Sequence, residues 1–365
     1  MQTKKTLIAL AVLGSFAGAA SAQSSSVTMF GVIDLSMRYV NNDAATYQLA
    51  QDGMAASRWG FRGVEDLGGG LKAGFWLEGA IGPDTGRGGP SFGNGTSAAQ
   101  PENALLFTRR ATVSLSNQYG EIRLGRDYTP TFWNIGVFDP FGVQGVGSSG
   151  NLFLSAEVRS LAGGGATYGT LVRANNAVQY ILPNGVFGPG LYGQVMVAAG
   201  ENAPANKYLG GRIGYAAGPF DVAVAYGDTD VDTAGNVTLG NWNLGGSWNF
   251  GVAKVSGFYG QLDLDGLAAG NVKQDNWFIG VSAPFGQWNF KASYGQVKQG
   301  GVLDGNKANQ FAIGTDYNLS KRTALYATYG SISNTHTAYS VSATGSALTR
   351  GNNSNGAELG IRHAF

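Results

Sequence analysis

The stretch SRWGFRG, residues 57–63, sets charged groups directly beside large apolar rings. Arg58 and Arg62 carry positive charge suited to contact with hydrated anions, while Trp59 and Phe61 carry aromatic rings that prefer an apolar or interfacial environment. Successive residues of an extended strand point to opposite faces, so a strand can serve both demands. The stretch predicts a wall with water on the side of Arg58 and Arg62, and lipid or another subunit on the other side.

Residues for catalysis or metal binding are scarce. The chain has no cysteine and two histidines, His336 in a polar stretch and His363 near the end, so a nucleophilic triad has few possible bases. An outer-membrane lipase is not excluded by composition, but His363 shares the parity of apolar residues and is a poor candidate. LDLDG at 262–266 lacks the rest of a calcium loop. We expect no enzyme activity, no cofactor and no bound metal.

Composition favours an ordered β structure. Glycine supplies 59 of 365 residues, aromatic residues 12% and charged residues 13%, about half of the usual charged share. Removing Lys4 and Lys5 from the 24 basic residues leaves 22 against 23 acidic ones, a charge of −1. The mature chain therefore has no excess of basic residues that would predict a nucleic-acid partner.

The first residues predict export. Lys4 and Lys5 precede an apolar run that ends in Ala20-Ser21-Ala22, which is typical of a secretory signal peptide and its cleavage site. The alternative, a membrane-spanning anchor, needs about 20 apolar residues and no cleavage site. We expect a signal peptide at 1–22 and a single mature domain at 23–365.

Alternation with a period of two runs through the whole mature chain. In VTMFGVIDLSMRYV, Val27, Met29, Ile33, Leu35, Met37 and Tyr39 share one face, and Thr28, Asp34, Ser36 and Arg38 share the other. Besides this first segment, we expect strands near 54–66, 70–82, 104–117, 120–128, 170–183, 190–200, 208–217, 219–229, 238–250, 252–263, 274–284, 286–298, 309–318, 321–333 and 355–365. The total is sixteen.

The connections alternate in length. Short turns such as AAGP, NFG and PFG alternate with longer polar segments near 41–53, 83–103, 129–169, 230–237, 264–273, 299–308 and 334–354. An even number of alternating strands, with short turns at one rim and long loops at the other, is typical of a transmembrane β-barrel. A soluble sandwich is the alternative, but it seldom needs sixteen meandering strands. The last strand, NGAELGIRHAF, ends in an aromatic residue, Phe365, as assembly signals of outer-membrane proteins do.

Four segments resemble the general trimeric porins of Gram-negative bacteria, the neisserial and β-proteobacterial branch above all. They are SSVTMFGVIDLSMRYVNN, SRWGFRGVEDLGGGLKAGFWLEG, LFTRRATVSLSNQYGEIRLGRDYTP and ELGIRHAF, in this order. The resemblance implies a sixteen-stranded antiparallel barrel in the cell outer membrane, three barrels per homotrimer, and a third loop folded inward. Implied partners are outer-membrane lipid and lipopolysaccharide, the barrel-assembly machinery, and small hydrophilic solutes and ions.

Residues of a channel constriction follow in part from alternation and in part from the resemblance. Alternation places Arg38 and Arg58 on the water-facing side, and the resemblance adds Arg109 and Arg173. Asp139 and Glu157 of the third loop are expected to oppose them. For Arg109 and its neighbour Arg110 the two arguments conflict: alternation selects Arg110 for the lumen because Val113 and Leu115 share the parity of Arg109, whereas the family position matches Arg109.

Other arginines and aromatic residues are expected to face outward. Arg126, and with it Arg110, is expected at the trimer interface, where Glu102 of a neighbour's second loop is a candidate partner. Aromatic residues near strand ends suit the interfacial girdles of a barrel. They are Tyr39, Trp59, Trp76, Trp242, Trp277, Trp288, Tyr317 and Phe365.

The sequence predicts a general diffusion porin, a passive channel for small hydrophilic solutes and ions with a weak preference for anions. One alternative is a substrate-specific porin, guided by aromatic residues of the third loop (Phe132, Trp133, Phe138, Phe141 and Phe153). The other is a structural or adhesive surface barrel with a plugged lumen. A constriction role for Arg58 predicts that Arg58→Glu shifts the selectivity towards cations.

Overall fold

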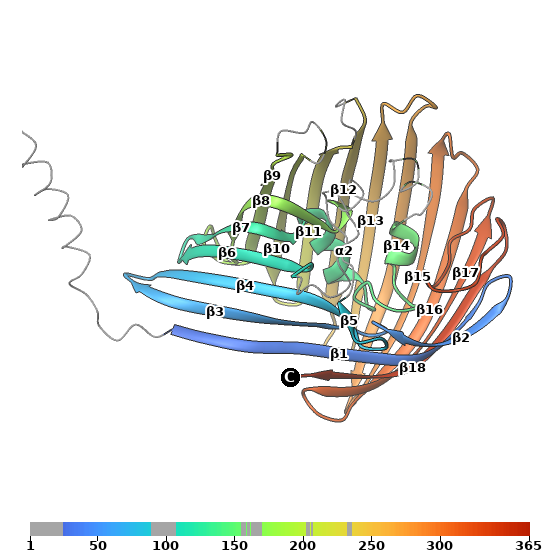
Figure 1. The fold of residues 1–365 in the computed structure, drawn as a ribbon, viewed down its shortest axis with the longest axis horizontal. Helices are drawn as coiled ribbons and strands as arrows, with labels where there is room; N and C mark the ends of the chain where they lie inside the picture. Colours follow the sequence, from blue (N-terminus) through green and yellow to red (C-terminus); the bar gives the residue numbers. More distant parts are fainter. Residues whose placement is uncertain are drawn as a thin grey trace, which may run out of the picture.

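The protein is a closed β-barrel. The computed structural model describes residues 25–88, 107–154, 158, 161, 170–201, 205, 207–231 and 236–365, and the strands in these ranges form one eighteen-stranded sheet (Figure 1). Two strands are additions, because β5 (Arg87–Gly88) pairs only with the end of β4 and β2 (Ala45–Gln51) continues the line of β3. Subtracting these two leaves the sixteen wall strands that the sequence predicts.

The wall strands follow the chain. They are β1 (Ser25–Asn41), β3 (Arg58–Gly68), β4 (Leu71–Gly82), β6 (Arg110–Asn117), β7 (Gly120–Tyr128), β8 (Arg173–Leu182), β9 (Leu191–Ala198), β10 (Tyr208–Ala217), β11 (Phe220–Asp230), β12 (Thr238–Asn249), β13 (Lys254–Asp265), β14 (Val272–Phe285), β15 (Trp288–Gly301), β16 (Lys307–Asn318), β17 (Thr323–Thr335) and β18 (Ser354–Ala364).

The closing seam joins the first strand to the last. Each wall strand pairs antiparallel with the next, and β18 returns to β1 in the register from Val32↔Ala364 to Asn41↔Asn355. Closure gives each of the sixteen wall strands a partner on both edges, as a sheet surrounded by lipid requires. The prediction that the end of the chain supplies the closing strand is therefore confirmed.

The two faces of the wall separate apolar from polar residues. On β1 the side chains of Val27, Met29 and Met37 are exposed on the outer face, while Asp34 and Ser36 are almost fully buried on the inner face. The same division holds for the inward Asn243 of β12 and Gln274 of β14. Alternation thus fixes which residues face the interior.

The second strand of the wall is interrupted. β2 pairs with the C-terminal half of β1, and β3 pairs with its N-terminal half. Residues 52–57 therefore bulge from the wall opposite Ile33 and Asp34. The carboxylate of Asp34 accepts hydrogen bonds from the backbone N–H groups of Met54 (2.9 Å) and Ala55 (2.7 Å) and from the hydroxyl of Tyr326 (2.5 Å). The prediction of a loop over 41–53 is wrong for β2, and Asp34 holds the bulge.

Connections differ between the two ends of the barrel. At one end, called the short-turn end, connections such as 69–70, 118–119, 218–219 and 319–322 join the strands. Longer connections lie at the other end, and the longest is loop 3, residues 129–172 between β7 and β8. Its two described helices are α2 (Pro130–Phe138) and α3 (Gly150–Phe153). In the described part of the chain, no helix is long and apolar enough to cross a membrane.

Candidate functional site

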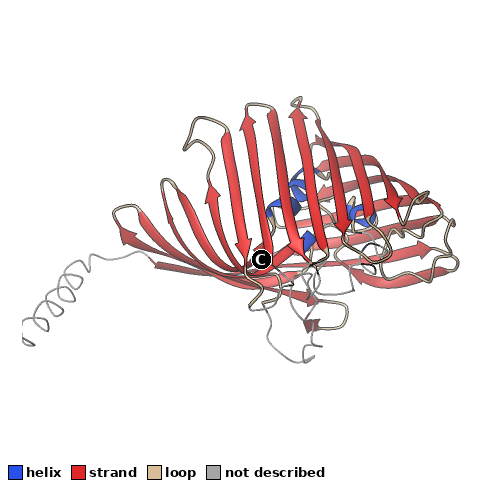
Figure 2. Cartoon of the chain, turned by 90° about the horizontal axis from the view of Figure 1, so that it is seen from above, coloured by secondary structure: helices blue, strands red, loops and turns tan. Residues whose placement is uncertain are grey.

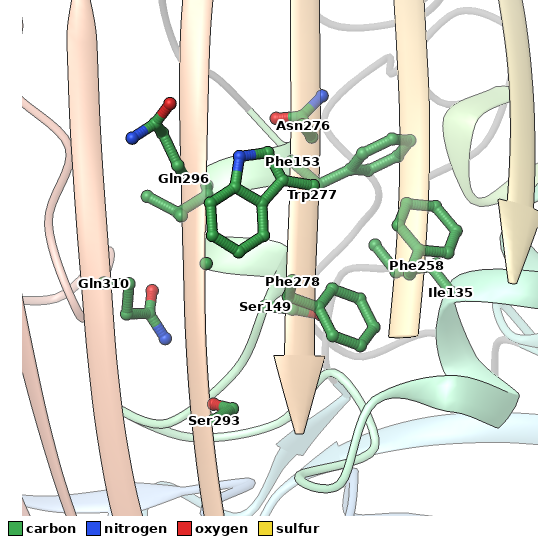
Figure 3. A pocket seen from close by; sticks show the side chains of 12 residues that line it. Ile135, Ser149, Phe153, Phe258, Asn276, Trp277, Phe278, Ser293, Gln296 and Gln310 are labelled. Atoms are coloured by element: carbon green, nitrogen blue, oxygen red, sulfur yellow. The ribbon is translucent and has the colours of Figure 1, made fainter. Parts of the chain in front are cut away.

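Loop 3 lies inside the barrel, as Figures 1 and 2 show for its two helices. α2 contacts β11 and β12, and α3 contacts β15 and β16. Ile135 and Phe138 of α2 and Phe153 of α3 are buried with Phe258 and Phe278 of the wall in one apolar cluster. Figure 3 shows Ile135 and Phe153 beside these two wall rings. Burial of these large side chains fixes loop 3 to one side of the interior.

Inward-facing glycines provide the space in which loop 3 lies. A β-carbon on Gly245 of β12 would be 2.1 Å from the ring of Phe138, and one on Gly280 of β14 would be 2.3 Å from Pro140. Further along, Gly314, Gly330 and Gly356 of β16, β17 and β18 approach Phe141 and Val146 in the same way. We call these five glycines the glycine groove. A side chain at these positions would collide with loop 3, so glycine here is a requirement of packing.

The tip of loop 3 is fixed by a buried ion pair on the closing seam. Arg38 of β1 and Glu358 of β18 are register partners, and an N–O distance of 2.8 Å joins their side chains. The second carboxylate oxygen of Glu358 accepts the backbone N–H of Val146 at 3.0 Å. Arg38 thus lies on the inner wall, as alternation predicts, but its charge is compensated and largely buried.

Asp139 directs its carboxylate into loop 3 itself. Its oxygens accept the backbone N–H groups of Phe141, Val143 and Ser149, each at 3.0 Å, and the hydroxyl of Ser149 at 2.7 Å. With these four donors Asp139 organises the turn that follows α2. Its predicted partner Glu157 lies outside the described residues.

Three of the four predicted arginines do gather on one part of the wall. Nε of Arg109 lies 2.6 Å from a carboxylate oxygen of Glu78, and Nε of Arg58 lies 4.0 Å from the same oxygen. Arg109 also donates to the hydroxyl of Tyr128 at 2.7 Å, and the guanidinium of Arg173 stacks on the ring of Tyr128 at 4.1 Å. Arg58, with 31% of its side chain exposed, is the most open of the three. We call Arg58, Arg109, Arg173 and Glu78 the basic wall.

Arg109 and Arg110 both direct their guanidinium groups inward. Arg109 immediately precedes β6, so strand alternation does not apply to it. Arg110 begins β6 and faces Trp76 at 4.5 Å and Asp127 at 3.5 Å. Arg110 therefore lies inside the barrel, where alternation alone places it, and not on the outward face that a contact with a neighbouring subunit requires.

Arg126 and Phe365, both expected to face outward, have partners within the same chain. Nε of Arg126 donates to the backbone oxygen of Thr108 at 2.6 Å, and its Nη1 donates to Asn175. Glu102, the candidate partner across a subunit interface, lies outside the described residues, as does the predicted signal peptide at 1–22. Phe365 exchanges backbone hydrogen bonds with Gly31 of β1, and its ring covers that glycine.

The aromatic predictions are confirmed only in part. Trp59 and Phe61 point outward together, with ring centroids 5.6 Å apart, but Trp76 points inward and hydrogen-bonds Glu78 at 3.1 Å. Its neighbours Phe75 and Leu77 occupy the outward positions. Of the loop 3 residues that a guiding track would use, Phe138, Phe141 and Phe153 are buried in the contact with the wall. Those three rings are not available to a passing solute.

Three residues of the site have no place in the sequence prediction: Glu78, Tyr128 and Glu358. Glu78 shares the strand parity of Trp76, and Glu358 lies opposite Arg38, so correct face assignments on β4 and β18 would have found both. Tyr128 ends β7, beyond the part of the strand in which parity is informative. Neither the pairing of Arg38 nor the orientation of Asp139 has a local signal.

Comparisons with known proteins match the whole architecture. A model of the family described as Gram-negative porin matches residues 9–337. The outer membrane porin protein 32 of Delftia acidovorans is 38% identical over 380 residues, covering 99% of this chain and 100% of the relative. An outer membrane porin protein of Bordetella pertussis is 31% identical over 293 residues, covering 69% of this chain and 68% of the relative.

Solved structures agree with this result. The anion-selective porin from Comamonas acidovorans has a TM-score of 0.80 at 36% identity, covering 94% of this chain and 100% of that one. OmpT of Vibrio cholerae in its trimer form has a TM-score of 0.66 at 14% identity, covering 94% and 100%. The second likeness concerns the fold alone.

Proposed function

Because the chain belongs to the Gram-negative porin family, we propose that it is an outer-membrane diffusion channel whose constriction gives it a weak preference for anions. Family membership carries the outer-membrane location and the role of a passive channel for small hydrophilic solutes and ions. The preference for anions is what the basic wall adds.

The observation that carries this preference is an imbalance of charge. The basic wall holds three arginines and one carboxylate, which leaves two positive charges by count. On loop 3, the carboxylate of Asp139 accepts hydrogen bonds from backbone N–H groups of the loop itself. The charge of Arg38 is compensated by Glu358. An anion passing the basic wall therefore meets the net positive charge of these four residues, of which Arg58 is the most open arginine.

Reversal potentials in a salt gradient across a planar bilayer test the proposal. Two unit charges 5 Å apart in water interact by about 0.8 kcal/mol. Arg58→Glu changes the wall by two units, and salt screens part of the effect, so we expect the anion-to-cation permeability ratio to fall by a factor of about five. The exposed Arg322→Gln, in a turn at the short-turn end, is a control for loss of charge alone. An unchanged reversal potential in Arg58→Glu would remove Arg58 from the selective step.

We also propose that the protein is a homotrimer in which Arg126 lies at the subunit interface and contacts the neighbour's second loop, with Glu102 as partner. Membership of the porin family supports this assembly. Arg126→Glu should lower the temperature at which the trimer dissociates in native electrophoresis. A wild-type protein that runs as a monomer under native conditions would contradict the proposal.

The ends of the chain complete the proposal. We infer that residues 1–22 are removed on export, that Phe365 is the signal for the barrel-assembly machinery, and that the outer face contacts lipid and lipopolysaccharide. The contact of the Phe365 ring with Gly31 supports a role for the terminal residue in closing the seam. Deletion of Phe365 should reduce the assembled protein in outer-membrane fractions, whereas Phe365→Tyr should not.

A further inference from the structure

Below the basic wall, towards the short-turn end, an arginine is held by stacking alone. Arg62 lies four residues beyond Arg58 on β3, about 13 Å along the strand. Its guanidinium lies over the rings of Phe30 and Trp76, at 5.4 and 5.1 Å from their centroids. The two rings are 4.9 Å apart, and Arg110 stacks on Trp76 at 4.5 Å. Two guanidinium groups therefore flank one inward-facing indole.

The charges around this stack are unevenly shared. Arg123 pairs with two carboxylates near the stack, at 2.9 Å from Glu121 and 2.5 Å from Asp127, and Arg110 lies 3.5 Å from Asp127. A third carboxylate, that of Glu78, accepts the indole N–H of Trp76 at 3.1 Å. Arg62 is exposed and makes no ion pair or hydrogen bond within the described residues, so its own charge is not paired there.

Stacking and hydrogen bonding use different parts of a guanidinium. Cation–π contact occupies its flat face, while the N–H donors point outward from its edge in the geometry that matches a carboxylate. At Arg62 the two rings hold the face, and the edge is open to the water of the interior. The half-buried rings of Phe30 and Trp76 lie beside that edge and offer apolar surface.

We propose that Arg62, with Phe30 and Trp76, is a binding site for small organic carboxylates that carry a flat apolar ring. The carboxylate pairs with the edge of Arg62, and the ring of the solute covers the aromatic surface next to it. This inference rests on the proposed channel function and names a class of solute that pauses on its way through. It is separate from the basic wall, which acts on all anions by charge.

Block of single-channel current tests the site, with benzoate and acetate as probes. Added at the short-turn side in potassium chloride, benzoate should reduce the current with a half-blocking concentration at least about fivefold below that of acetate, since both probes carry one charge and only benzoate carries a ring. Arg62→Gln should raise the half-blocking concentration of benzoate about tenfold, as expected for loss of a charged, two-point contact.

Matched variants separate charge from shape. Arg322→Gln removes one charge at the same end, without an aromatic partner, and should leave the benzoate block within about twofold of wild type, because an exposed charge in a salt solution is screened. Arg62→Lys keeps the charge but loses the planar fork, and Phe30→Leu keeps the charge but loses a ring. Phe30→Leu should reduce the preference for benzoate over acetate and leave the acetate block in place, whereas Arg62→Lys should weaken the block by both probes and keep the preference.

Calorimetric titration of benzoate into the detergent-solubilised protein gives a readout that needs no current. If wild type carries no current but binds benzoate through Arg62, the channel function fails and the site stands. Equal block by benzoate and acetate in wild type would overturn the site, and so would equal benzoate binding by Arg62→Gln and Arg322→Gln.

Discussion

On β1 and β18, Arg38 and Glu358 face each other across one register position and bury their charges together. In the basic wall, by contrast, Arg58 and Arg109 share the single carboxylate of Glu78, and Arg173 stacks on Tyr128. Both groups lie on the inner wall. The first group fixes the tip of loop 3 and leaves no net charge. The second leaves two positive charges, and Arg58 is open to water. An inward-facing arginine is therefore not by itself evidence of selectivity, because its partners decide whether a solute meets its charge.

The largest expected effect on stability comes from breaking the ion pair between Arg38 and Glu358. Glu358→Ala leaves the buried charge of Arg38 without a partner and frees the N–H of Val146, so we expect the free energy of unfolding to fall by about 3–5 kcal/mol. Urea titration of the folded barrel measures the change. The exposed Glu65→Ala is the control, and a loss below about 1 kcal/mol for Glu358→Ala would contradict the role of the ion pair.

The glycine groove gives the next largest effect. In Gly245→Ala the new methyl group would lie 2.1 Å from the ring of Phe138, and overpacking of this kind costs about 1–3 kcal/mol. Because loop 3 must shift to relieve the contact, we expect the single-channel conductance to change as well. Gly246→Ala is the matched control on the outer side of the same strand. Its new methyl group would have its nearest neighbour, the backbone oxygen of Asp221, at 3.4 Å. Equal behaviour of the two variants would show that the groove does not position loop 3.

A smaller effect, on ion selectivity, is expected from a change in the basic wall. Glu78→Gln removes the one carboxylate of the basic wall, so its net charge rises from two to three, and we expect the anion-to-cation permeability ratio to rise two- to fourfold, from about 0.8 kcal/mol before screening. Reversal potentials measure this ratio. The change is opposite in sign to that of Arg58→Glu, so a shift in the same direction for both variants would rule out a simple count of charges.

The smallest effect is expected at Asp43, in the connection between β1 and β2. Asp43 accepts hydrogen bonds from the hydroxyl (2.5 Å) and N–H (2.7 Å) of Thr349 and from Asn352 (2.7 Å), and these bonds, with the side chain of Thr349 first, lower the pKa of its carboxyl. A lowered folded pKa means that the contribution is complete above the unfolded pKa of about 3.9 and is lost as the pH falls through the folded value.

Hydrogen exchange at the amide of Thr349 reports this contact. Asp43→Asn should reduce protection of that amide at neutral pH, and the difference should shrink as the pH falls through the lowered pKa of the wild-type carboxyl. A difference between the two proteins that persists unchanged at the lower pH would exclude the carboxylate as its cause.

Most of the fold is encoded locally and was predictable. Alternation depends only on which residues touch lipid and which touch water, so it placed the wall strands and the faces of Asp34, Arg38 and Arg58. β2 and the bulge at 52–57 were missed because their reason is distant in the sequence: Asp34 holds the bulge together with Tyr326, almost 300 residues away. Trp76 was misplaced because its residue type was given more weight than its parity.

The site was less predictable, because the predictions assigned charges one by one. The number of arginines on the wall followed from alternation and family resemblance, but their compensation depends on pairs such as Arg38 with Glu358, which lie at opposite ends of the chain. Asp139 is a similar case, since only the turn it organises explains where its carboxylate points. Roles for Arg58, Arg109 and Arg173 in selectivity remain predictions for the measurements above.

The closing seam has a consequence for the order of folding. β18 supplies both the strand that completes the wall and Glu358, which fixes the tip of loop 3. Contacts between Val32 and Ala364 span almost the whole chain and are among the last that a folding chain can form. A nascent or truncated chain without this strand lacks both the seal of the wall and the contact that fixes the tip of loop 3.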